Sequence, residues 1–379
     1  MRVHTLHLTA FRNHADTALQ PGTGITLLVG DNGQGKTNVL EAISFLSLSK
    51  SFYAANDAQA VMLGQDVLEI GAGIAHDAGR EFDVRVTVRA TSGDKAIRVN
   101  GSALEKLSAL VGMFPAVILS PEQGGIIAGA PAERRKFLDV VLSQTSRSYL
   151  ADVMEYRRVL RQRKKLLLDA RLAGTPPARE LPAWTDELVR LGSRLIHMRE
   201  RFVDGVHTEF AETYRALAGT RGDAAVRYIT ADGIVHGMET AEIAGCLREA
   251  IARREAEELR RGATLAGPHR DDLAFEIDGR AAERYASQGE QKTLLIALKL
   301  SEYRFVSVRC GETPILLLDD VFAELDRHRA ARVMHMLRST AGQCIITATD
   351  EALIGEAPRW NNEHRRIIVD SGTCREASS

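Results

Sequence analysis

A glycine-rich loop set between an apolar run and an amphipathic segment constrains this 379-residue chain more than any other feature. Gly30-Asp-Asn-Gly-Gln-Gly-Lys-Thr37 matches the pattern GxxxxGK[ST]. The residues before it, 24–29, predict a buried strand, and the apolar spacing after it predicts a helix over 36–48. In that setting the glycines let backbone N–H groups turn toward phosphate oxygens. We therefore expect this loop to bind a nucleoside triphosphate.

The residues expected to contact that nucleotide are Gly30, Asp31, Asn32, Gly33, Gln34, Gly35, Lys36, Thr37 and Asn38. Lys36 should reach the β- and γ-phosphates and so act catalytically, and the Thr37 hydroxyl should coordinate Mg²⁺. A chance glycine-rich turn is the alternative, and the flanking strand and helix argue against it.

A second motif supplies the acids that such a loop requires. Four consecutive apolar residues, 315–318, precede Asp319 and Asp320. Asp319 is expected to hold Mg²⁺, through its water shell, and Asp320 to orient the attacking water and so act catalytically. A surface turn with two solvated acids is the alternative, and the apolar run before the acids speaks against it.

The composition describes an ordinary globular chain, with 45% hydrophobic and 26% charged residues. The formal net charge of −1 does not by itself indicate a nucleic-acid partner, so any basic surface must be confined to part of the chain. No run of about 18 apolar residues suggests a membrane span. The four cysteines, Cys246, Cys310, Cys344 and Cys374, form no CxxC pair, which fits a reducing cytoplasm and counts against structural zinc or disulfides.

Apolar residues in the middle of the chain recur with a helical period. The expected helices span residues 133–170, 183–217 and 240–261. A proline-rich stretch, 174–182, separates the first two because proline cannot continue a helix. At 67–100, by contrast, apolar and polar residues alternate, which predicts a small antiparallel sheet.

These patterns predict an α/β fold in which a P-loop head is made from both ends of the chain. Lobe I, the head, would comprise residues 1–110 and 262–379, and lobe II, an inserted helical lobe, would comprise residues 111–261. Residues 372–379 are expected to form a frayed tail.

The string Ser287-Gln-Gly289-Glu290 precedes a helix expected at 293–305. Alone, such a string most often indicates a helix cap. Here it comes shortly before the acidic strand, and the order P-loop, signature loop, acidic strand resembles that of ABC-type ATPases. In that class the signature serine and glycine contact the γ-phosphate of ATP held by a second subunit. The resemblance thus implies that Ser287, Gly289 and Glu290 act in trans, and that Asp326 lies in the loop crossing the dimer interface.

A narrower resemblance rests on six stretches spread over nearly the whole chain: residues 11–13, 30–42, 48–52, 120–139, 267–273 and 317–326. They make the chain similar to the RecF family of bacterial recombination-repair ATPases, which are related to SMC-type heads. The stretch from Pro121 to Asp139 and Gly267-Pro-His-Arg-Asp-Asp-Leu273 are the most specific of the six. The implied fold is an ABC-type ATPase head with an inserted helical lobe.

Three positions depart from related ATPases. Glu290 stands where RecF members often carry glutamine, although SMC heads also use glutamate there. No histidine follows the strand expected at 343–349, where ABC transporters carry a switch histidine, which leaves that role to Thr347 or Thr349. Asp320 is one methylene shorter than the transporters' glutamate, so we expect slow hydrolysis that suits a switch and not a motor.

The RecF resemblance implies an ATP-dependent homodimer that clamps double-stranded DNA beside a gap or a single-stranded region. Hydrolysis of ATP would then open the clamp. It further implies DNA-stimulated ATP hydrolysis and work with RecO and RecR to load RecA in recombinational repair, the SOS response and replication. The expected location is the cytoplasm, at the nucleoid.

An SMC-type structural ATPase and a transporter subunit are the alternatives. The short helical lobe counts against the first, and the missing histidine and large insertion count against the second.

Six basic residues fall within 157–165, with no acid among them. Five are candidates for contacts with the DNA backbone: Arg157, Arg158, Arg161, Lys164 and Lys165. A solvated helix face is an equally weighted alternative. Arg134 and Arg135, in the specific stretch that ends at Asp139, are expected to order the joint between lobes.

Two further sites stay open between a structural and a ligand-binding role. Arg12 is placed either near the nucleotide base or at the surface. His269 and Arg270 either pair with Asp271 or Asp272, or contact nucleotide or DNA.

Overall fold

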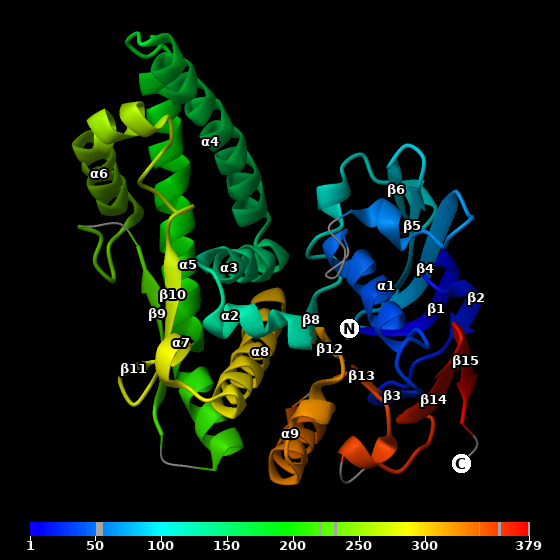
Figure 1. The fold of residues 1–379 in the computed structure, drawn as a ribbon. Helices are drawn as coiled ribbons and strands as arrows, with labels where there is room; N and C mark the ends of the chain where they lie inside the picture. The colour runs from blue at the N-terminus through cyan, green and yellow to red at the C-terminus, as the bar shows by residue number, and fades with distance from the viewer. Residues whose placement is uncertain (51–55, 220–221, 231–232, 341, 355–357, 378–379) are drawn as a thin grey trace. The chain divides into compact units, whose positions relative to one another are not determined.

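The computed structural model describes residues 1–50, 56–219, 222–230, 233–340, 342–354 and 358–377. They form two compact units (Figure 1). Unit 1 comprises Met1–Gly124, Thr213–Thr220 and Lys292–Ser379, and unit 2 comprises Gly125–Glu212 and Arg221–Gln291.

Three stretches lie across the predicted lobe boundaries, and one of them, Thr213–Thr220, belongs to unit 1 although it falls within predicted lobe II. Residues 111–124 belong to unit 1, where β8 (Ala116–Leu119) pairs with β12 (Ile315–Leu318) in a parallel ladder. Residues 262–291 belong to unit 2, where β10 (Asp272–Ile277) pairs with β9 (Ala224–Ile229). The helical period of the sequence does not report this strand pairing, which is why the boundaries of these other two stretches differ.

The first sheet of unit 1 has the order β15-β14-β3-β13-β12-β8. Its other strands are β3 (Ile25–Val29), β13 (Cys344–Ala348), β14 (Arg365–Asp370) and β15 (Thr373–Glu376). All neighbours are parallel except β14 and β15. Short, continuously apolar strands such as β12 are typical of a parallel sheet buried on both faces. Because β3, β12 and β13 are parallel, the predicted site residues that follow them meet at one edge of the sheet.

The second sheet of unit 1 is antiparallel, in the order β2-β1-β4-β5-β6-β7. Its strands are β1 (Arg2–Phe11), β2 (His14–Leu19), β4 (Val67–Ala75), β5 (Glu81–Arg89), β6 (Lys95–Val99) and β7 (Ser102–Ala103). Strands β4 to β6 confirm the antiparallel sheet predicted for 67–100. Helix α1 (Lys36–Leu48) has the predicted bounds, and its apolar side chains share one core with both sheets.

Two long helices follow later in the chain, α8 (Gln288–Cys310) and α9 (Arg327–Thr340). The unit boundary falls within α8, after Gln291. The frayed tail predicted at 372–379 is wrong for Thr373–Glu376, because β15 pairs with β14. Residues 378–379, like Ser51 and Phe52 of the stretch 48–52, lie outside the described residues.

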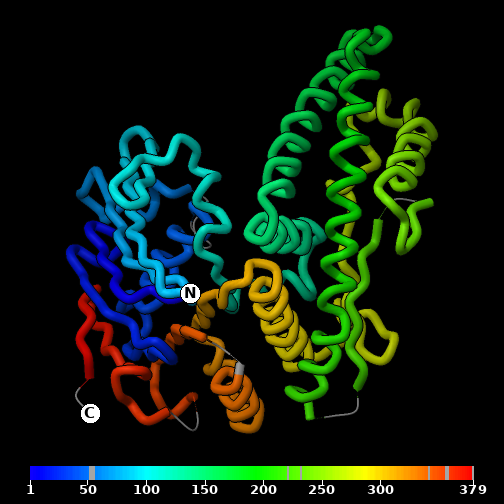
Figure 2. Tube along the Cα trace, turned by 180° about the vertical axis from the view of Figure 1, so that it is seen from behind, coloured from blue at the N-terminus to red at the C-terminus, as the bar shows by residue number. Residues whose placement is uncertain are grey.

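Unit 2 is built on helices α3 (Pro131–Thr145), α4 (Arg147–Ala173), α5 (Leu181–Ala218, whose end belongs to unit 1) and α6 (Thr240–Arg261). The predicted helix 133–170 is interrupted at Ser146, whose hydroxyl accepts a hydrogen bond from Tyr149 N and caps α4. Helices α4 and α5 form a long hairpin (Figure 2). The unit is completed by α2 (Gly125–Ala128), α7 (Ala282–Tyr285) and the sheet β11-β10-β9, with β11 at Arg280–Ala281. In the described ranges, no helix is long and apolar enough to cross a membrane.

Candidate functional site

The glycine-rich loop joins β3 to α1, and its glycines are required by conformation and by space. Gly33 and Gly35 have φ values of 82° and 111°, which favour glycine. A Cβ atom at Gly35 would lie 2.6 Å from Asn13 Oδ1, and one at Gly30 would lie 2.2 Å from Val369 O. The loop therefore has little freedom to accept side chains at these positions.

The two side chains that end the motif point to different parts of unit 1. Lys36 is buried, and its Nζ donates to the carbonyl oxygens of Gly30 and Asp31 at 2.6 and 2.9 Å. The Thr37 hydroxyl donates to Asp319 Oδ1 at 2.9 Å. The P-loop and the acidic strand, which are 282 residues apart in the sequence, therefore meet through a direct hydrogen bond.

The two acids follow β12 in different environments. Asp319 is buried, and its Oδ1 accepts a second hydrogen bond, from the Thr347 hydroxyl, at 2.8 Å. Asp320 has left-handed backbone angles, and its amide donates to Thr347 Oγ1 at 2.8 Å. Asp320 Oδ1 is buried and has no hydrogen-bond partner among the described residues.

Burial raises the pKa of the Asp319 carboxyl, and the negative charges of Asp320 and Glu122 raise it further. The hydroxyls of Thr347 and Thr37 oppose this shift. A divalent cation would relieve the excess negative charge, and a hydroxyl beside carboxylates is the oxygen ligand set that Mg²⁺ prefers. The residues present therefore fit the metal that the sequence predicts.

Two turns that sequence reasoning did not assign to the site hold the P-loop from outside. At the β1–β2 turn, Asn13 Nδ2 donates to Gln34 O at 3.0 Å, and the buried His14 places Nε2 3.1 Å from Gly35 O. At the β14–β15 turn, Ser371 N donates to Gln34 Oε1 at 2.6 Å and Gly372 N to Gln34 O at 2.9 Å. Burial lowers the pKa of His14, which favours the neutral ring.

Arg12 is half-buried beside the P-loop helix, and its place near the nucleotide base stays a prediction. Its guanidinium makes two hydrogen bonds, of 2.8 and 2.7 Å, to the buried carboxylate of Glu41 on α1. It also donates to Gln59 O at 2.9 Å. Arg12 therefore ties the β1–β2 turn to the helix that follows the P-loop.

The signature residues open α8. Glu290 N donates to Ser287 Oγ at 3.3 Å and Ser287 N donates to Glu290 Oε2 at 2.8 Å, which makes a capping box, and Ser287 Oγ also donates to Glu290 Oε2 at 2.7 Å. Ser287 is exposed and Gly289 half-buried. Asp326 is exposed and accepts from Arg329 N at 3.0 Å, at the start of α9. All four residues are held by local hydrogen bonds or backbone position and leave surface for a further contact.

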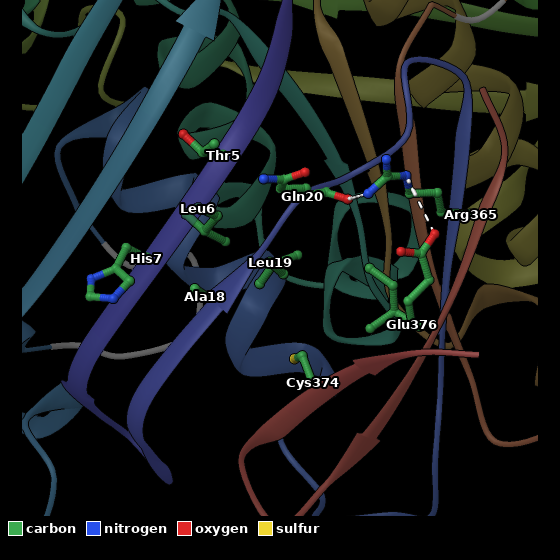
Figure 3. A pocket seen from close by; sticks show the side chains of 10 residues that line it. Thr5, Leu6, His7, Ala18, Leu19, Gln20, Arg365, Cys374 and Glu376 are labelled. Carbon is green, nitrogen blue, oxygen red and sulfur yellow. Dashed lines mark hydrogen bonds and ion pairs between the residues drawn. The ribbon is translucent and has the colours of Figure 1, made fainter. Parts of the chain in front are cut away.

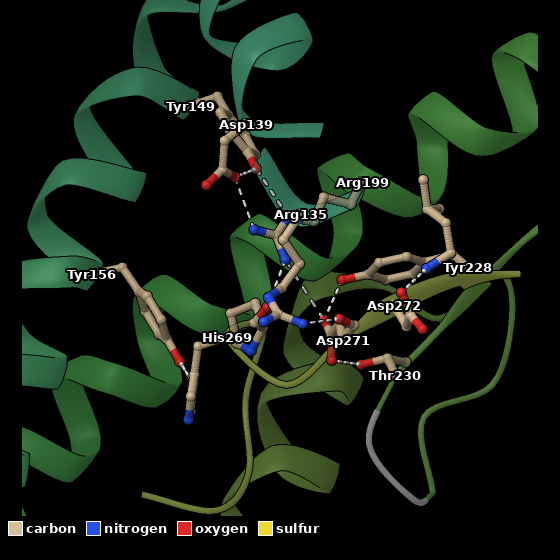
Figure 4. A network of polar contacts seen from close by, with 12 residues as sticks. Arg135, Asp139, Tyr149, Tyr156, Arg199, Tyr228, Thr230, His269, Asp271 and Asp272 are labelled. Atoms are coloured by element: carbon tan, nitrogen blue, oxygen red, sulfur yellow. Dashed lines mark hydrogen bonds and ion pairs between the residues drawn. The ribbon is translucent and has the colours of Figure 1, made fainter. Parts of the chain in front are cut away.

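The stretch 267–273 lies in a buried polar network of unit 2 that centres on Arg199 (Figure 4). The Arg199 guanidinium donates to Asp139 Oδ1 at 2.8 Å, to Tyr149 Oη at 3.0 Å and to Pro268 O at 2.7 Å. It also lies 3.9 Å from Asp271 Oδ2. Sequence reasoning missed Arg199, because nothing in the pattern of α5 sets it apart from the other arginines there.

The predicted pairing of His269 and Arg270 with the two following acids is wrong. His269 Nδ1 lies 2.8 Å from Tyr156 Oη and Nε2 lies 3.1 Å from Thr264 O, and burial lowers its pKa to about 4. Arg270 also reaches Thr264 O, at 3.5 Å. Among the described residues, neither side chain forms a hydrogen bond or ion pair with Asp271 or Asp272.

The two acids instead find partners on other elements of unit 2. Asp271 accepts from the hydroxyls of Tyr228 and Thr230, and burial raises its pKa to about 6. Asp272 accepts from Arg134, with Nη2 at 2.9 Å from Oδ2. Arg135 donates to Asp271 O at 2.9 Å. The contacts of Arg134 and Arg135 thus tie α3 to β10 within unit 2.

The basic run of α4 divides into residues that pair with an acid and exposed residues for which the described part of the chain offers no ion pair. Arg157 lies 2.7 Å from Asp139 Oδ2, and Arg158 pairs with Glu155 and lies over the Trp184 ring. Arg163 is buried against Glu258 at 2.6 Å. The side chains left exposed, with no ion pair in the described part of the chain, are Arg161, Lys164 and Lys165.

A hollow of about 370 Å³ lies elsewhere in unit 1, between the edge strands of its two sheets (Figure 3). Arg365 lines it, with Nη1 donating to Gln20 O at 2.9 Å and Nε 3.7 Å from Glu376 Oε1. None of the predicted site residues lines this hollow.

Comparisons with known proteins bear on the whole chain. The RecF/RecN/SMC N terminal domain family matches residues 2–368. The chain is 40% identical to the DNA replication and repair protein RecF of Salinibacter ruber, over 98% of this chain and 91% of that protein. It is also 40% identical to RecF of Chloroherpeton thalassium, over 92% and 95% of the two chains.

Comparison with solved structures leads to the same family and fold. One described as the recombination mediator protein RecF-ATP in the RecFOR pathway has a TM-score of 0.90 and 27% identity, over 99% of this chain and 97% of that chain. An SMC head bound to a winged-helix domain of ScpA, at 16% identity and a TM-score of 0.58 over 100% and 98% of the chains, shares the fold. The predicted α/β ABC-type head with an inserted helical lobe is confirmed. The chain belongs to the RecF family of DNA replication and repair proteins, within the RecF/RecN/SMC N terminal domain family.

Proposed function

We propose that this chain is a recombination mediator that binds ATP and Mg²⁺, dimerises on ATP and closes on DNA, and that slow hydrolysis releases it. The observation that carries the proposal is the hydrogen bond from Thr37 to Asp319, which joins the P-loop to the acidic strand. A RecF relative was solved with ATP, which supports the choice of nucleotide.

The roles proposed for the site follow from its geometry. The backbone of Gly30–Asn38 would hold the phosphates, and Lys36 would move from the loop carbonyls to the β- and γ-phosphates. Thr37 and Asp319 would hold Mg²⁺, whose chemistry when bound is to neutralise charge on the phosphates. Asp320, one carboxylate oxygen of which has no partner among the described residues, would orient the attacking water.

Dimerisation would complete the site. Ser287 and Gly289, at the exposed start of α8, would contact the γ-phosphate held by a second copy, with Glu290 keeping Ser287 in place. Asp326, exposed before α9, would line the same interface. This part of the proposal rests on the order of the motifs and on the exposure of these residues.

DNA would lie against the exposed cations of α4: Arg161, Lys164 and Lys165. Arg157 and Arg158 carry less weight because each already has an acidic partner. The RecFOR pathway of the solved relative supports RecO and RecR as partners in loading RecA, at gapped or junction DNA in the bacterial cytoplasm.

The experiment is sizing of the purified chain with and without ATP and Mg²⁺, followed by addition of gapped duplex DNA. The wild type should become dimeric with ATP, and Asp320→Asn should keep the dimer because hydrolysis is blocked. Lys36→Met should remain monomeric and lose ATP-dependent DNA binding. A Lys36→Met protein that still dimerises on ATP and binds DNA as the wild type does would refute the clamp.

The DNA face has its own test. Replacing Arg161, Lys164 and Lys165 with alanine should weaken binding and flatten the dependence of log K on log salt, by about 0.9 for each phosphate that is no longer neutralised. Arg190→Ala is the matched control, because this exposed arginine of α5 pairs with Glu187. An unchanged salt slope in the triple variant would remove this face from the proposal.

A further inference from the structure

Thr347 is a polar residue at the centre of an apolar strand. Strand β13 reads Cys344-Ile-Ile-Thr-Ala348 and lies between β3 and β12, with Thr347 opposite Leu28. The side chain is fully buried. A buried hydroxyl is unfavourable unless it is hydrogen-bonded, so the partners of Thr347 explain why it is tolerated there.

Both partners of the hydroxyl belong to the acidic pair. Its single proton goes to Asp319 Oδ1 at 2.8 Å, and its oxygen accepts the Asp320 amide at 2.8 Å. Thr37 donates to the same Asp319 Oδ1 from the P-loop side. The carboxylate is therefore held between two hydroxyls, and neither of them uses Oδ2.

The bond to the Asp320 amide fixes an unfavourable backbone conformation. Asp320 has φ 51° and ψ 22°, a left-handed conformation that residues other than glycine adopt only occasionally. This conformation turns the chain out of β12 into the turn at Val321–Glu324. It also sets the direction in which the Asp320 side chain leaves the backbone.

We propose that Thr347 is a positioning residue that sets, through one hydroxyl, both the metal-holding carboxylate of Asp319 and the backbone of the hydrolytic Asp320. The inference rests on the proposed function. It gives Thr347 no contact with the γ-phosphate, because a phosphate oxygen needs a donor and the single hydroxyl proton of Thr347 is already donated to Asp319. Of the two threonines considered for the switch role, only the half-buried Thr349 is left for it.

The test compares Thr347→Val, which keeps the shape and removes the hydroxyl, with Thr347→Ser, which keeps the hydroxyl. ATP turnover is measured over a range of Mg²⁺ concentrations. Thr347→Val should lower kcat by about 100-fold, as expected for misplaced catalytic groups, and should raise the half-saturating Mg²⁺ concentration several-fold. The KM for ATP at saturating Mg²⁺ should change little, and Thr347→Ser should restore both values to within a few-fold of the wild type.

Thr26→Val is the matched control. Thr26 is also fully buried in the same sheet and accepts a backbone N–H, from Gly22, but it contacts neither acid. Thermal unfolding of each variant without nucleotide reports on folding, and Thr347→Ala gives the same kinetic comparison if the valine variant folds poorly.

Two outcomes would overturn the inference: wild-type kcat and Mg²⁺ dependence in Thr347→Val, or equal impairment of Thr347→Ser and Thr347→Val. Failure of the proposed function looks different, because the wild type itself would then neither bind nor hydrolyse ATP. A wild type that hydrolyses ATP and is inactivated by Lys36→Met keeps the proposed function, whatever Thr347 does.

Discussion

Each unit contains a buried polar cluster with aspartates and cations, and the two clusters differ in how their charges are balanced. In unit 2, the carboxylates of Asp139 and Asp272 each lie against an arginine, and Arg199 is buried among its partners. In unit 1, Asp319 and Asp320 meet at a sheet edge where Lys36 is bonded to backbone carbonyls instead. The unit 2 cluster balances its own charge, whereas the unit 1 cluster does not.

The pKa values of Asp139 and Asp319 shift in opposite directions, although burial also raises the pKa of Asp271 in unit 2, to about 6. Burial opposes ionisation of Asp139, yet Arg199 and the Tyr149 hydroxyl hold its pKa below the usual value. For Asp319, burial and neighbouring acids prevail and the pKa is raised. A polar cluster that satisfies itself stabilises a fold, and one left with excess charge is suited to bind a cation.

The largest effect on stability is expected from Arg199→Met. It leaves Asp139 and Asp271 buried without this cation, and breaking such an arrangement costs about 3–5 kcal/mol. Urea unfolding measures the free energy lost. A loss below about 1 kcal/mol would mean that the unit 2 cluster is not what holds this unit together.

Lys36→Met, in contrast to Arg199→Met, should impair ATP hydrolysis strongly and stability only slightly. Hydrolysis should fall by about 100-fold or more, as for loss of a preorganised charge at a transition state. The unfolding free energy without nucleotide should change by only about 1 kcal/mol, since only hydrogen bonds to two carbonyls are lost. Turnover and urea unfolding are measured on the same samples, and a large loss of stability would blur the contrast between the clusters.

His14 gives a pH test of the turn that holds the P-loop. Its pKa is lowered in the folded chain, so its contribution to stability is present above the unfolded value, near 6.5, and is lost as the pH falls from there through the lowered folded value. The limiting slope for one proton is about 1.4 kcal/mol per pH unit. His14→Gln should lose less stability than the wild type between pH 7 and 5, measured by urea unfolding. If the unfolding free energies of the wild type and His14→Gln fell in parallel with pH, His14 would not be the source of this pH dependence.

Arg157→Ala should have the smallest effect. Arg157 contacts the same Asp139 as Arg199 does, but it is more than half exposed, and exposed ion pairs contribute about 0–1 kcal/mol. Thermal unfolding of Arg157→Ala and Arg199→Met, measured side by side, compares the stability that each variant loses. Comparable losses from the two variants would show that burial is not what separates the two arginines.

Local motifs made part of this molecule predictable. The P-loop, helix 36–48 and the acidic strand each have a period or a spacing of their own, and the structure brings Thr37 and Asp319 together as those motifs require. The helix break at Ser146 was missed because the apolar stripe continues across it while a single side chain caps α4.

What the sequence concealed depends on contacts between distant segments. Thr347 and His14 carry no motif, and their roles emerge only once β13 and the β1–β2 turn are packed against the site. Arg163 sits inside a basic run and is nevertheless buried against Glu258, which no charge count along α4 reveals.

The β14–β15 turn has a consequence for the time at which the site can form. Ser371 holds Gln34 across 337 residues of chain. During synthesis the P-loop leaves the ribosome 337 residues before the turn that fixes it. A nascent or prematurely ended chain would therefore carry the complete phosphate-binding motif without its support.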